Sequence, residues 1–566
     1  MRFKMTQSPL KITKTGLDLI RDARLNKGLA FSQKERLDFQ LNGILAPAVL
    51  SLEEQIQNAW AGLKSIEDRP SQYRWLREIR QDNETLFYAL LQTYPQELLP
   101  IIYTPGIGEA CLNYPFSGNR PEGFYLSAGC KIPVKEQLAN APKNIRLIVV
   151  TDGSRILGLG DLGANGIGIV IGKSALYTGF AQIDPALILP IMLDIGTENE
   201  KYLQDPAYMG WRHKRLQGKK YDDFISECVS AFQEKYPSAL LHWEDFNREH
   251  AAPLLTRYHK QYLSFNDDIQ GTASITLAAI LAALIRTGRP LKEEKIMIFG
   301  GGSAGCGIAT LIAALLRKQG LSEAESTQNI YLVDRFGLIT EEMENLTKEQ
   351  KIFAKSSGTA DSAGTDLAQL VKRLKPSTLI GVSGQANMFT EAVLRQMGEN
   401  SPCPIIFPLS NPTDHAEATP AEIYKATNGR AMICTGSPFP PLEIKSTDMD
   451  ENRPTTRDVL FSQVNNAAVF PGIGLGALAC EAKEISEGMF LAAAIRIAQS
   501  SPNKVSKENG ILPKVENFSE LALEVANAVA EQAQKENLCP KFTPEILEEK
   551  LTALQWKAAY REYMPA

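Results

Sequence analysis

The chain has 566 residues, of which 44% are hydrophobic and 22% are charged. This length exceeds what one ordinary hydrophobic core accommodates, so roughly three or four domains are expected. The formal net charge is only −5, and acidic and basic residues are interspersed. Because nucleic-acid-binding and membrane-surface proteins carry concentrated basic charge, we expect neither a nucleic acid nor a membrane as a partner.

The cysteines indicate a reducing compartment. Eight are scattered along the chain without a CxxC pair or a histidine at zinc-like spacing, which is typical of free thiols in an intracellular protein. The first seventeen residues contain basic residues and no acid, a weak feature of a transit peptide, but they lack its arginine-rich amphipathic pattern. The apolar run 273–285 is broken by Thr276 and ends before Arg286, too short for a bilayer. We therefore expect a cytoplasmic protein.

Residues 31–98 have helical periodicity. The segment 51–66, "SLEEQIQNAWAGLKSI", opens on a capping box from Ser51 to Glu54, and the segments "QYRWLREI" and "ETLFYALLQTY" follow at helical spacing. We predict a helical N-terminal region.

From Ile145 onward, short β-branched runs alternate with glycine-rich or helical stretches, as in parallel-sheet proteins. The first set is "IRLIVVTD", "LILPIML" and "ALLHWED", and the second is "EKIMIFG", "NIYLVD", "TLIGVSG" and "PIIFPLS". The fold class is therefore α/β with two parallel-sheet domains. The tail from about Glu531 is charged and is predicted to be helical.

One glycine-rich run has the context of a dinucleotide site. Gly300, Gly302 and Gly305 follow the strand-like "KIMIF", open a helix, and lead to a second strand that ends at Asp334. The glycines allow the backbone to approach a pyrophosphate, the helix N-terminus faces its charge, and the acid accepts the ribose hydroxyls. The interval to Asp334 is longer than usual. The alternative is a tight strand-helix turn without a ligand.

The run 158–174, "GLGDLGANGIGIVIGKS", also contains GxGxxG and ends like a phosphate-binding P-loop. It fails that pattern because Ile167 stands where the loop needs glycine. Lys173 follows a nearly uncharged stretch, so burial could lower its pKa enough for a base, with a nearby carboxylate to orient it. The alternative is a solvated lysine. A third run, 470–479, is more typical of backbone packing.

Two acidic pairs each follow an apolar run, in "LLHWEDF" and in "FNDDIQGTA". At one edge of a sheet, three of these carboxylates would form an oxygen-only site for Mg²⁺ or Mn²⁺, and the fourth could serve Lys173. Helix N-caps and solvated acids are the alternative for either pair alone.

With these motifs the chain resembles the malic enzymes over nearly its whole length. The matching stretches are "LNKGLAF", "YTPGIGEA", "VVTDGSRILGLGDLG", "GKSALYTG", "WEDF", "FNDDIQGTA", "GGGSAGCGIA", "PLSNPT" and "NNAAVFPG".

The resemblance implies a role for each site residue. Lys173 would be the base that takes the malate hydroxyl proton, with Asp267 as its partner, and Tyr103 the acid that protonates the enol carbon. Arg155 would grip a substrate carboxylate. The remaining implied residues are the metal ligands Glu244, Asp245 and Asp268, the malate-pocket residues Asn411 and Asn466, and the cofactor-binding residues Gly300, Gly302, Ser303, Ala304, Gly305, Asp334, Arg335 and Asn411.

The resemblance also implies an architecture. It comprises a helical N-terminal domain (1–119), a split substrate and metal-binding α/β domain (120–266 and 466–530), a Rossmann-type NAD-binding domain (267–465) and a C-terminal helical extension (531–566). A homotetramer or homodimer is implied. Fumarate-activated relatives carry an arginine before "NETLFY", where this chain has Asp82, so that style of activation is not expected.

The implied activity is oxidative decarboxylation of L-malate to pyruvate and CO₂, with NAD and Mn²⁺ or Mg²⁺. Asp334 favours NAD because it repels a 2′-phosphate, although Arg335, Lys348 and Lys351 lie close enough in sequence to blunt that repulsion. A malolactic enzyme, which releases lactate and retains NAD, is one alternative. "LLHWEDF" and "ENLTKEQKIFAK" are somewhat similar to the malolactic versions, whereas Arg155 stands where that pattern has glycine. A catalytically silent NAD-binding scaffold is the other alternative.

Overall fold

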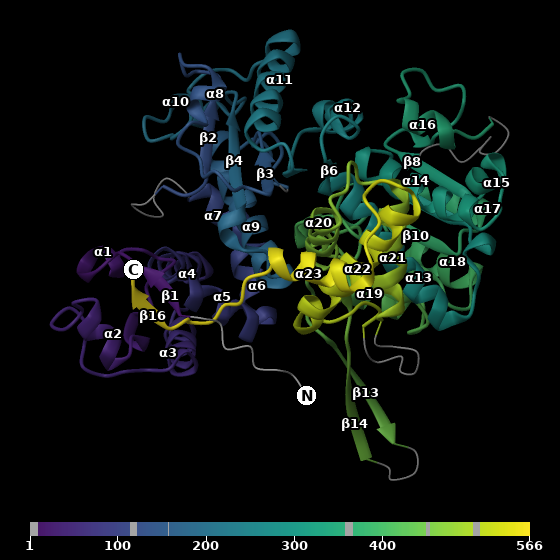
Figure 1. Cartoon of the computed structure of the whole chain (residues 1–566). Coiled ribbons are helices and arrows are strands. Elements are labelled where there is room, and N and C mark those ends of the chain that lie inside the picture. The colour runs from purple at the N-terminus through teal and green to yellow at the C-terminus, as the bar shows by residue number, and fades with distance from the viewer. Residues whose placement is uncertain (1–8, 114–120, 157, 357–365, 449–452, 502–509) are drawn as a thin grey trace.

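The computed structural model describes residues 9–113, 121–156, 158–356, 366–448, 453–501 and 510–566. Residues 1–8 of the basic N-terminal stretch considered above as a transit peptide therefore lie outside the described residues. A helical N-terminal module, two α/β units and a central group of helices follow one another in Figure 1.

The N-terminal module is helical, as predicted. Ser51 caps the helix Leu52–Lys64 through a reciprocal capping box with Glu54, which satisfies two exposed backbone N–H groups. The helices are α1 (Gly16–Ile20), α2 (Gln33–Asp38), α3 (Leu52–Lys64), α4 (Arg69–Asp82), α5 (Glu84–Thr93), α6 (Pro95–Ile102) and α7 (Gly106–Leu112).

The two ends of the described chain pair with each other. Strand β1 (Leu10–Ile12) lies parallel to β16 (Tyr563–Pro565), and the C-terminal segment crosses the molecule to reach it (Figure 1). The helical extension expected from Glu531 is shorter than the sequence suggested: α22 (Phe518–Lys535) continues into it and α23 (Pro544–Leu554) follows, but the last residues are extended. Their strand is specified by a partner far away in sequence.

The first α/β unit has a five-stranded parallel sheet in the order β2-β4-β3-β5-β6. The three predicted strands are present as β3, β4 and β5. The strands are β2 (Phe124–Ser127), β3 (Leu147–Thr151), β4 (Ile188–Asp194), β5 (Leu240–Trp243) and β6 (Ser264–Asn266), and the helices are α8 (Val134–Gln137), α9 (Ile167–Ala181), α10 (Glu200–Gln204), α11 (Gly218–Lys235) and α12 (Arg248–Tyr258).

The second α/β unit has a seven-stranded sheet in the order β15-β12-β11-β10-β7-β8-β9, parallel except for β9. Its four predicted strands are present. The strands are β7 (Ile296–Phe299), β8 (Ile330–Asp334), β9 (Gly337–Leu338), β10 (Thr378–Gly381), β11 (Ile405–Pro408), β12 (Met432–Thr435) and β15 (Ser462–Gln463), and the helices are α14 (Ser303–Lys318), α15 (Glu323–Gln328), α16 (Lys348–Phe353), α17 (Leu367–Leu374), α18 (Glu391–Asn400) and α19 (Pro420–Ala426). The antiparallel hairpin β13 (Leu442–Asp448) and β14 (Arg453–Val459) projects from this unit (Figure 1).

Apolar helices connect the two units. A π-helical turn (Asp267–Gly271) leads into α13 (Thr272–Thr287), which packs against α14 and α21 (Glu487–Gln499). Helix α20 (Phe470–Ala479) packs against α9 and α22. The combined helix Asp267–Thr287 is long and apolar enough to span a bilayer, more than the sequence run suggested, but 67% of its apolar window is buried inside the protein. We interpret it as a core helix.

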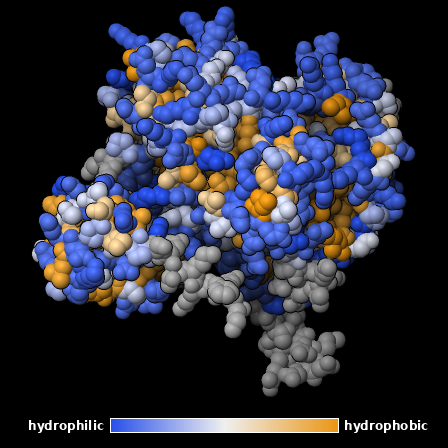
Figure 2. All heavy atoms as spheres, viewed as in Figure 1, coloured by the Kyte–Doolittle hydropathy of each residue, from blue (hydrophilic) through white to orange (hydrophobic). Residues whose placement is uncertain are grey.

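The visible surface in Figure 2 is mainly hydrophilic, with hydrophobic patches near the middle of the molecule and at the lower right. Individual exposed apolar side chains include Leu17, Leu37 and Val49 in the N-terminal module.

Candidate active site

The two acidic pairs follow neighbouring strands. Strands β5 and β6 run parallel, with Trp243 opposite Asn266, so the residues that come next leave the sheet at the same edge. Glu244 and Asp245 follow β5, and Asp267 and Asp268 follow β6. Both pairs therefore lie close together at the carboxyl ends of the strands, where ligands bind in open α/β sheets.

Lys173 lies between these pairs. It projects from α9, its side chain is fully buried, and its ammonium forms a short hydrogen bond to Asp267 Oδ2 and lies 3.0 Å from Glu244 Oε1. The ammonium also lies 4.4 Å from the ring centroid of Phe470 and 5.3 Å from that of Tyr103. The solvated-lysine alternative is therefore wrong, and the expected carboxylate partner is present.

Glu244, Asp245 and Asp268 present ligand atoms within 4.8 Å of one another. Asp245 Oδ2 is buried and has no hydrogen-bond partner among the described residues. Asp245 also has a φ of 54°, a conformation that costs energy in residues other than glycine and is often found at functional sites. An unpaired, buried carboxylate oxygen in an all-oxygen cluster fits a hard divalent cation such as Mg²⁺ or Mn²⁺.

The ionisation of the site reflects burial and mutual repulsion. Burial raises the pKa of Glu244, Asp245 and Asp268, and neighbouring carboxylates add to the rise. For Lys173, burial acts to lower the pKa, but Asp267 and Glu244 outweigh it and the net pKa is raised. The expectation of a lowered lysine pKa is thus wrong for the site without a cation. A bound divalent cation would offset these carboxylate charges.

Tyr103 lies at the end of α6 and is buried beside Lys173. Burial raises its pKa strongly, with opposition from the Lys173 charge. The phenol therefore keeps its proton over the ordinary pH range, as a proton donor must.

Of the two asparagines predicted to bind malate, only Asn466 is bonded to the lysine pair among the described residues. Asn466 donates from Nδ2 to Asp267 Oδ2 at 2.9 Å, so it adjoins the lysine pair. Asn411 follows β11, is exposed, and accepts at Oδ1 from Ser437 Oγ at 2.6 Å. No hydrogen bond among the described residues joins Asn411 to the carboxylate cluster.

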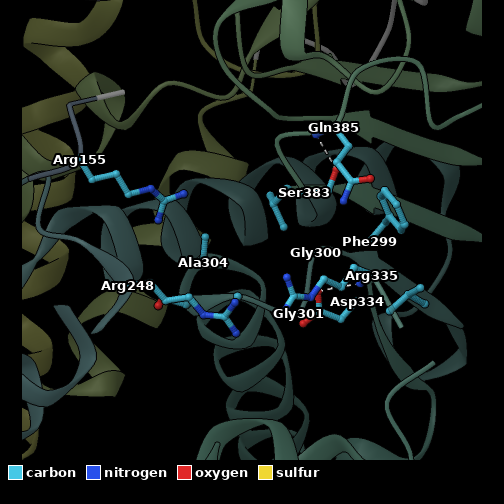
Figure 3. Close-up of a pocket in the computed structure, with 14 residues that line it drawn as sticks. Arg155, Arg248, Phe299, Gly300, Gly301, Ala304, Asp334, Arg335, Ser383 and Gln385 are labelled. Carbon is cyan, nitrogen blue, oxygen red and sulfur yellow. Dashed lines mark hydrogen bonds between the residues drawn. The ribbon is translucent and has the colours of Figure 1, made fainter. Parts of the chain in front are cut away.

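Arg155 lies on the loop after β3. Its backbone N–H donates to the Asp245 carbonyl oxygen at 3.3 Å, so the loop is attached to the acidic cluster. Its exposed side chain lines a cavity of about 210 Å³ that extends over the glycine-rich turn of the second α/β unit. Figure 3 shows its guanidinium directed into this cavity. Arg155 thus lies between the carboxylates and the glycine-rich turn.

The glycine-rich turn forms the floor of this cavity. Gly300 has a φ of +126°, and a Cβ there would lie 2.6 Å from the Val382 carbonyl carbon, while a Cβ on Gly305 would lie 2.0 Å from the Gly300 oxygen. A Cβ on Gly302 would instead occupy open space. Helix α14 begins at Ser303, so its N-terminus faces the cavity, which fits a pyrophosphate. Of the residues predicted to bind cofactor, all except Gly305 and Asn411 line it directly.

Asp334 at the end of β8 borders the cavity. Its Oδ1 accepts from the Arg335 backbone N–H at 2.7 Å, and the carboxylate lies beside Gly301. This is the place where a ribose would lie in a Rossmann-type site.

Several residues at the site were not predicted from the sequence. Arg248, at the first position of α12, lines the cavity from the other α/β unit (Figure 3). Ser383 and Gln385 line it from the loop after β10. His242 bonds to Glu244. Strand alternation could have revealed His242, since residues two apart on a strand share a face, but the place of Arg248 depends on how the two units meet.

The fold and the site define an α/β enzyme in which a dinucleotide cavity adjoins a buried lysine and a carboxylate cluster. Comparison with known families agrees. The family model "Malic enzyme, N-terminal domain" matches residues 80–259, and "Malic enzyme, NAD binding domain" matches residues 269–534. The chain belongs to the malic enzyme family.

Curated relatives cover the whole chain. An NAD-dependent malic enzyme of Photorhabdus laumondii is 43% identical over 99% of this chain and 98% of its own length. One of Pseudomonas syringae is 42% identical over 99% of both chains. Among solved structures, a malic enzyme of Entamoeba histolytica gives a TM-score of 0.57 at 21% identity, covering 92% of both chains. One of Pyrococcus horikoshii gives 0.54 at 24% identity, covering 81% of this chain and 89% of that one. These structures support the fold alone.

Proposed function

We propose that the chain catalyses the oxidative decarboxylation of L-malate to pyruvate and CO₂ with reduction of NAD, assisted by Mn²⁺ or Mg²⁺. The observation that carries this proposal is the position of Lys173, buried between Asp267 and Glu244 and next to the carboxylate cluster. Family membership and relatives named NAD-dependent malic enzymes support the same reaction.

In the first step, Lys173 accepts the hydroxyl proton of malate while the C2 hydride leaves, which gives oxaloacetate. Asp267, supported by Asn466, holds the lysine in place. Arg155 binds a substrate carboxylate with charge-assisted hydrogen bonds. Loss of CO₂ then gives an enolate, and Tyr103 donates the proton that converts it to pyruvate.

The cofactors supply what side chains cannot. A divalent cation held by Glu244, Asp245 and Asp268 would polarise the substrate oxygen and stabilise the negative charge of the enolate. NAD in the cavity over Gly300 to Ala304 would accept the hydride. Asp334 favours NAD over NADP, because a carboxylate accepts from a free ribose hydroxyl and repels a 2′-phosphate.

Malolactic activity receives no support from these matches. One of the sequence features that resembles the malolactic versions, "LLHWEDF", contains His242, which bonds to Glu244. The guanidinium of Arg155, where the malolactic pattern has glycine, favours the malic reaction. A silent scaffold is equally unsupported, because every proposed reactive group is present.

We also propose a cytoplasmic protein that self-associates into a tetramer or dimer. Leu17, Leu37, Ile44 and Val49 of the N-terminal module are 39–71% exposed, and such apolar side chains could pack against a second copy of the chain. Light scattering of the purified full-length chain tests this, and a monomer at micromolar concentration would contradict it.

The proposed reaction predicts NADH formation that depends on L-malate, on NAD and on Mn²⁺. The experiment measures NADH absorbance with L-malate, with D-malate and with a chelator present. Equal rates with both malate enantiomers, or an undiminished rate after complete removal of divalent cations, would contradict the proposal.

A further inference from the structure

His242 is a buried histidine that the proposed reaction does not use. It lies on β5, two residues before Glu244, and its side chain is fully buried. Because strand residues alternate between faces, its side chain points to the same side of the sheet as Glu244. Its ring packs edge-on against Phe265 and Phe470 at centroid distances of 4.7 and 5.5 Å. This packing fixes the plane of the imidazole.

Two hydrogen bonds indicate which nitrogen of the His242 ring carries the proton. Its Nε2 lies 2.9 Å from Glu244 Oε2, and its Nδ1 lies 2.8 Å from the hydroxyl of Tyr177. A carboxylate can only accept, so we assign the imidazole proton to Nε2. In a neutral ring Nδ1 then carries a lone pair and accepts from the tyrosine hydroxyl. The direction of donation therefore runs from Tyr177 through His242 to Glu244.

Tyr177 connects this pair to the helix of the proposed base. It lies on α9, four residues after Lys173, so both side chains project from one face of the helix. Its ring contacts that of Phe470 at 4.8 Å, and Phe470 in turn lies under the Lys173 ammonium. A Cβ on Gly474 would lie 2.6 Å from the Tyr177 ring, so glycine leaves the space that this ring fills.

His242 is poorly placed to be a metal ligand itself. His242, Glu244 and Asp267 do form a second group whose ligand atoms lie within 4.8 Å of one another. However, the Lys173 ammonium already bonds both Glu244 and Asp267. A divalent cation there would meet that positive charge, whereas Asp245 and Asp268 form no ion pair with Lys173 among the described residues.

We propose that His242, oriented by Tyr177, is a positioning residue that fixes the carboxylate of Glu244 for metal binding. Glu244 is then held at both oxygens, with Oε1 toward Lys173 and Oε2 toward His242. Its remaining lone pairs are available to a cation shared with Asp245 and Asp268. The inference rests on the proposed metal site, and it adds two residues to that site that touch neither substrate nor cofactor.

The test measures Mn²⁺ binding without turnover. Free Mn²⁺ is followed by its electron paramagnetic resonance signal as the full-length protein is titrated, for wild type and for His242→Leu, His242→Gln and Tyr177→Phe. Leucine removes the donor, whereas glutamine places an amide N–H near the position of Nε2. His259→Gln, at the far end of α12, is the control. Thermal unfolding without metal reports whether each variant is folded.

His242→Leu should weaken Mn²⁺ binding by about 10- to 100-fold, as is usual when the partner of a ligand is lost. His242→Gln should restore most of the affinity, and Tyr177→Phe should show a smaller loss. If His242→Leu does not fold, a loss in Tyr177→Phe with recovery in His242→Gln carries the test. Wild-type affinity in folded His242→Leu, or glutamine that binds Mn²⁺ no better than leucine, would overturn the inference. If His242→Leu does not fold, wild-type affinity in Tyr177→Phe would overturn it.

The same titration separates this inference from the proposed function. Malate oxidation by wild type with unchanged Mn²⁺ affinity in the variants would overturn the inference and leave the proposed function intact. Mn²⁺ binding that depends on His242, in a protein that does not oxidise malate, would support the positioning role and overturn the proposed function.

Discussion

The ammonium of Lys173 lies 3.0 Å from Oε1 of Glu244, so the proposed base and a proposed metal ligand share one carboxylate. Without a cation, this arrangement helps to raise the lysine pKa. A cation bound to Glu244 would partly neutralise the carboxylate charge, and the contribution of that charge to the raised lysine pKa would then be smaller. Metal binding and base strength should therefore be coupled.

Removing Asp268 should test the metal cluster. Asp268→Ala takes away one of three anionic ligands, so Mn²⁺ binding should weaken and turnover fall by orders of magnitude while the fold survives. The measurements are a Mn²⁺ titration and the rate at limiting metal. Glu249→Gln, which changes an exposed acid on α12, is the control. Normal turnover of Asp268→Ala at limiting Mn²⁺ would show that the cluster is not the metal site.

Lys173→Arg should separate charge from basicity. Arginine keeps a positive charge between Asp267 and Glu244 but does not give up its proton in a protein. Malate oxidation should fall by about 10²- to 10⁴-fold, the usual contribution of a general base, whereas NADH binding, followed by its fluorescence, should change little. Parallel loss of NADH affinity would instead assign Lys173 to binding of the cofactor phosphates.

Arg248→Ala should weaken the dinucleotide complex. Its side chain lines the cavity near Asp334 (Figure 3) and adds a positive charge that can bind the pyrophosphate. We expect the Kd for NADH to rise about tenfold, which corresponds to about 1.4 kcal/mol. Arg257→Ala, on the same helix but bonded to Asp222, is the matched control. An unchanged Kd for NADH in Arg248→Ala would remove this residue from the cofactor site.

Ionisation of Glu122 should make the free energy of unfolding depend on pH in the acidic range. Burial acts to raise its pKa, but Arg80 and Arg77 outweigh burial and the net pKa is lowered. The side chain is 13% exposed, and Oε1 lies 2.5 Å from Arg80. Because the folded pKa is below the unfolded value of 4.5, its contribution is complete above that pH. It is lost as the pH falls through the folded pKa.

Glu122→Gln should therefore lower the free energy of unfolding by about 3 kcal/mol near neutral pH. The difference from wild type should shrink below pH 4.5. Chemical denaturation at several pH values measures it, with Glu78→Gln on the exposed face of α4 as the control. A difference that stays constant down to the lowest pH that permits folding would show that the charge of Glu122 does not stabilise the folded state.

Much of the fold was predictable because its signals are local. The run "KIMIF" is apolar and β-branched, and it becomes β7 followed by the glycine-rich turn. The capping box at Ser51 likewise predicted where α3 begins. Strand β16 could not be predicted in this way. The segment "YMP" has little strand character, and its conformation comes from pairing with Leu10–Ile12 at the other end of the chain.

The site was predictable where acids follow strands. Parallel strands place their carboxyl ends at one edge, so Glu244 and Asp267 could be expected to meet. The pKa of Lys173 could not be read from its apolar surroundings, because the opposing effect comes from carboxylates 71 and 94 positions away in sequence. The position of Arg248 over the cavity depends on how the two α/β units pack together, and no local sequence pattern predicts that packing.

The central claim is the malic reaction, and the most direct test is the product balance with L-malate, NAD and Mn²⁺. The account predicts pyruvate, CO₂ and NADH in equal amounts, with little lactate, because Arg155 and the carboxylate cluster support oxidation with release of the reduced cofactor. Stoichiometric lactate and CO₂ without net NADH would contradict it and assign the chain to malolactic chemistry.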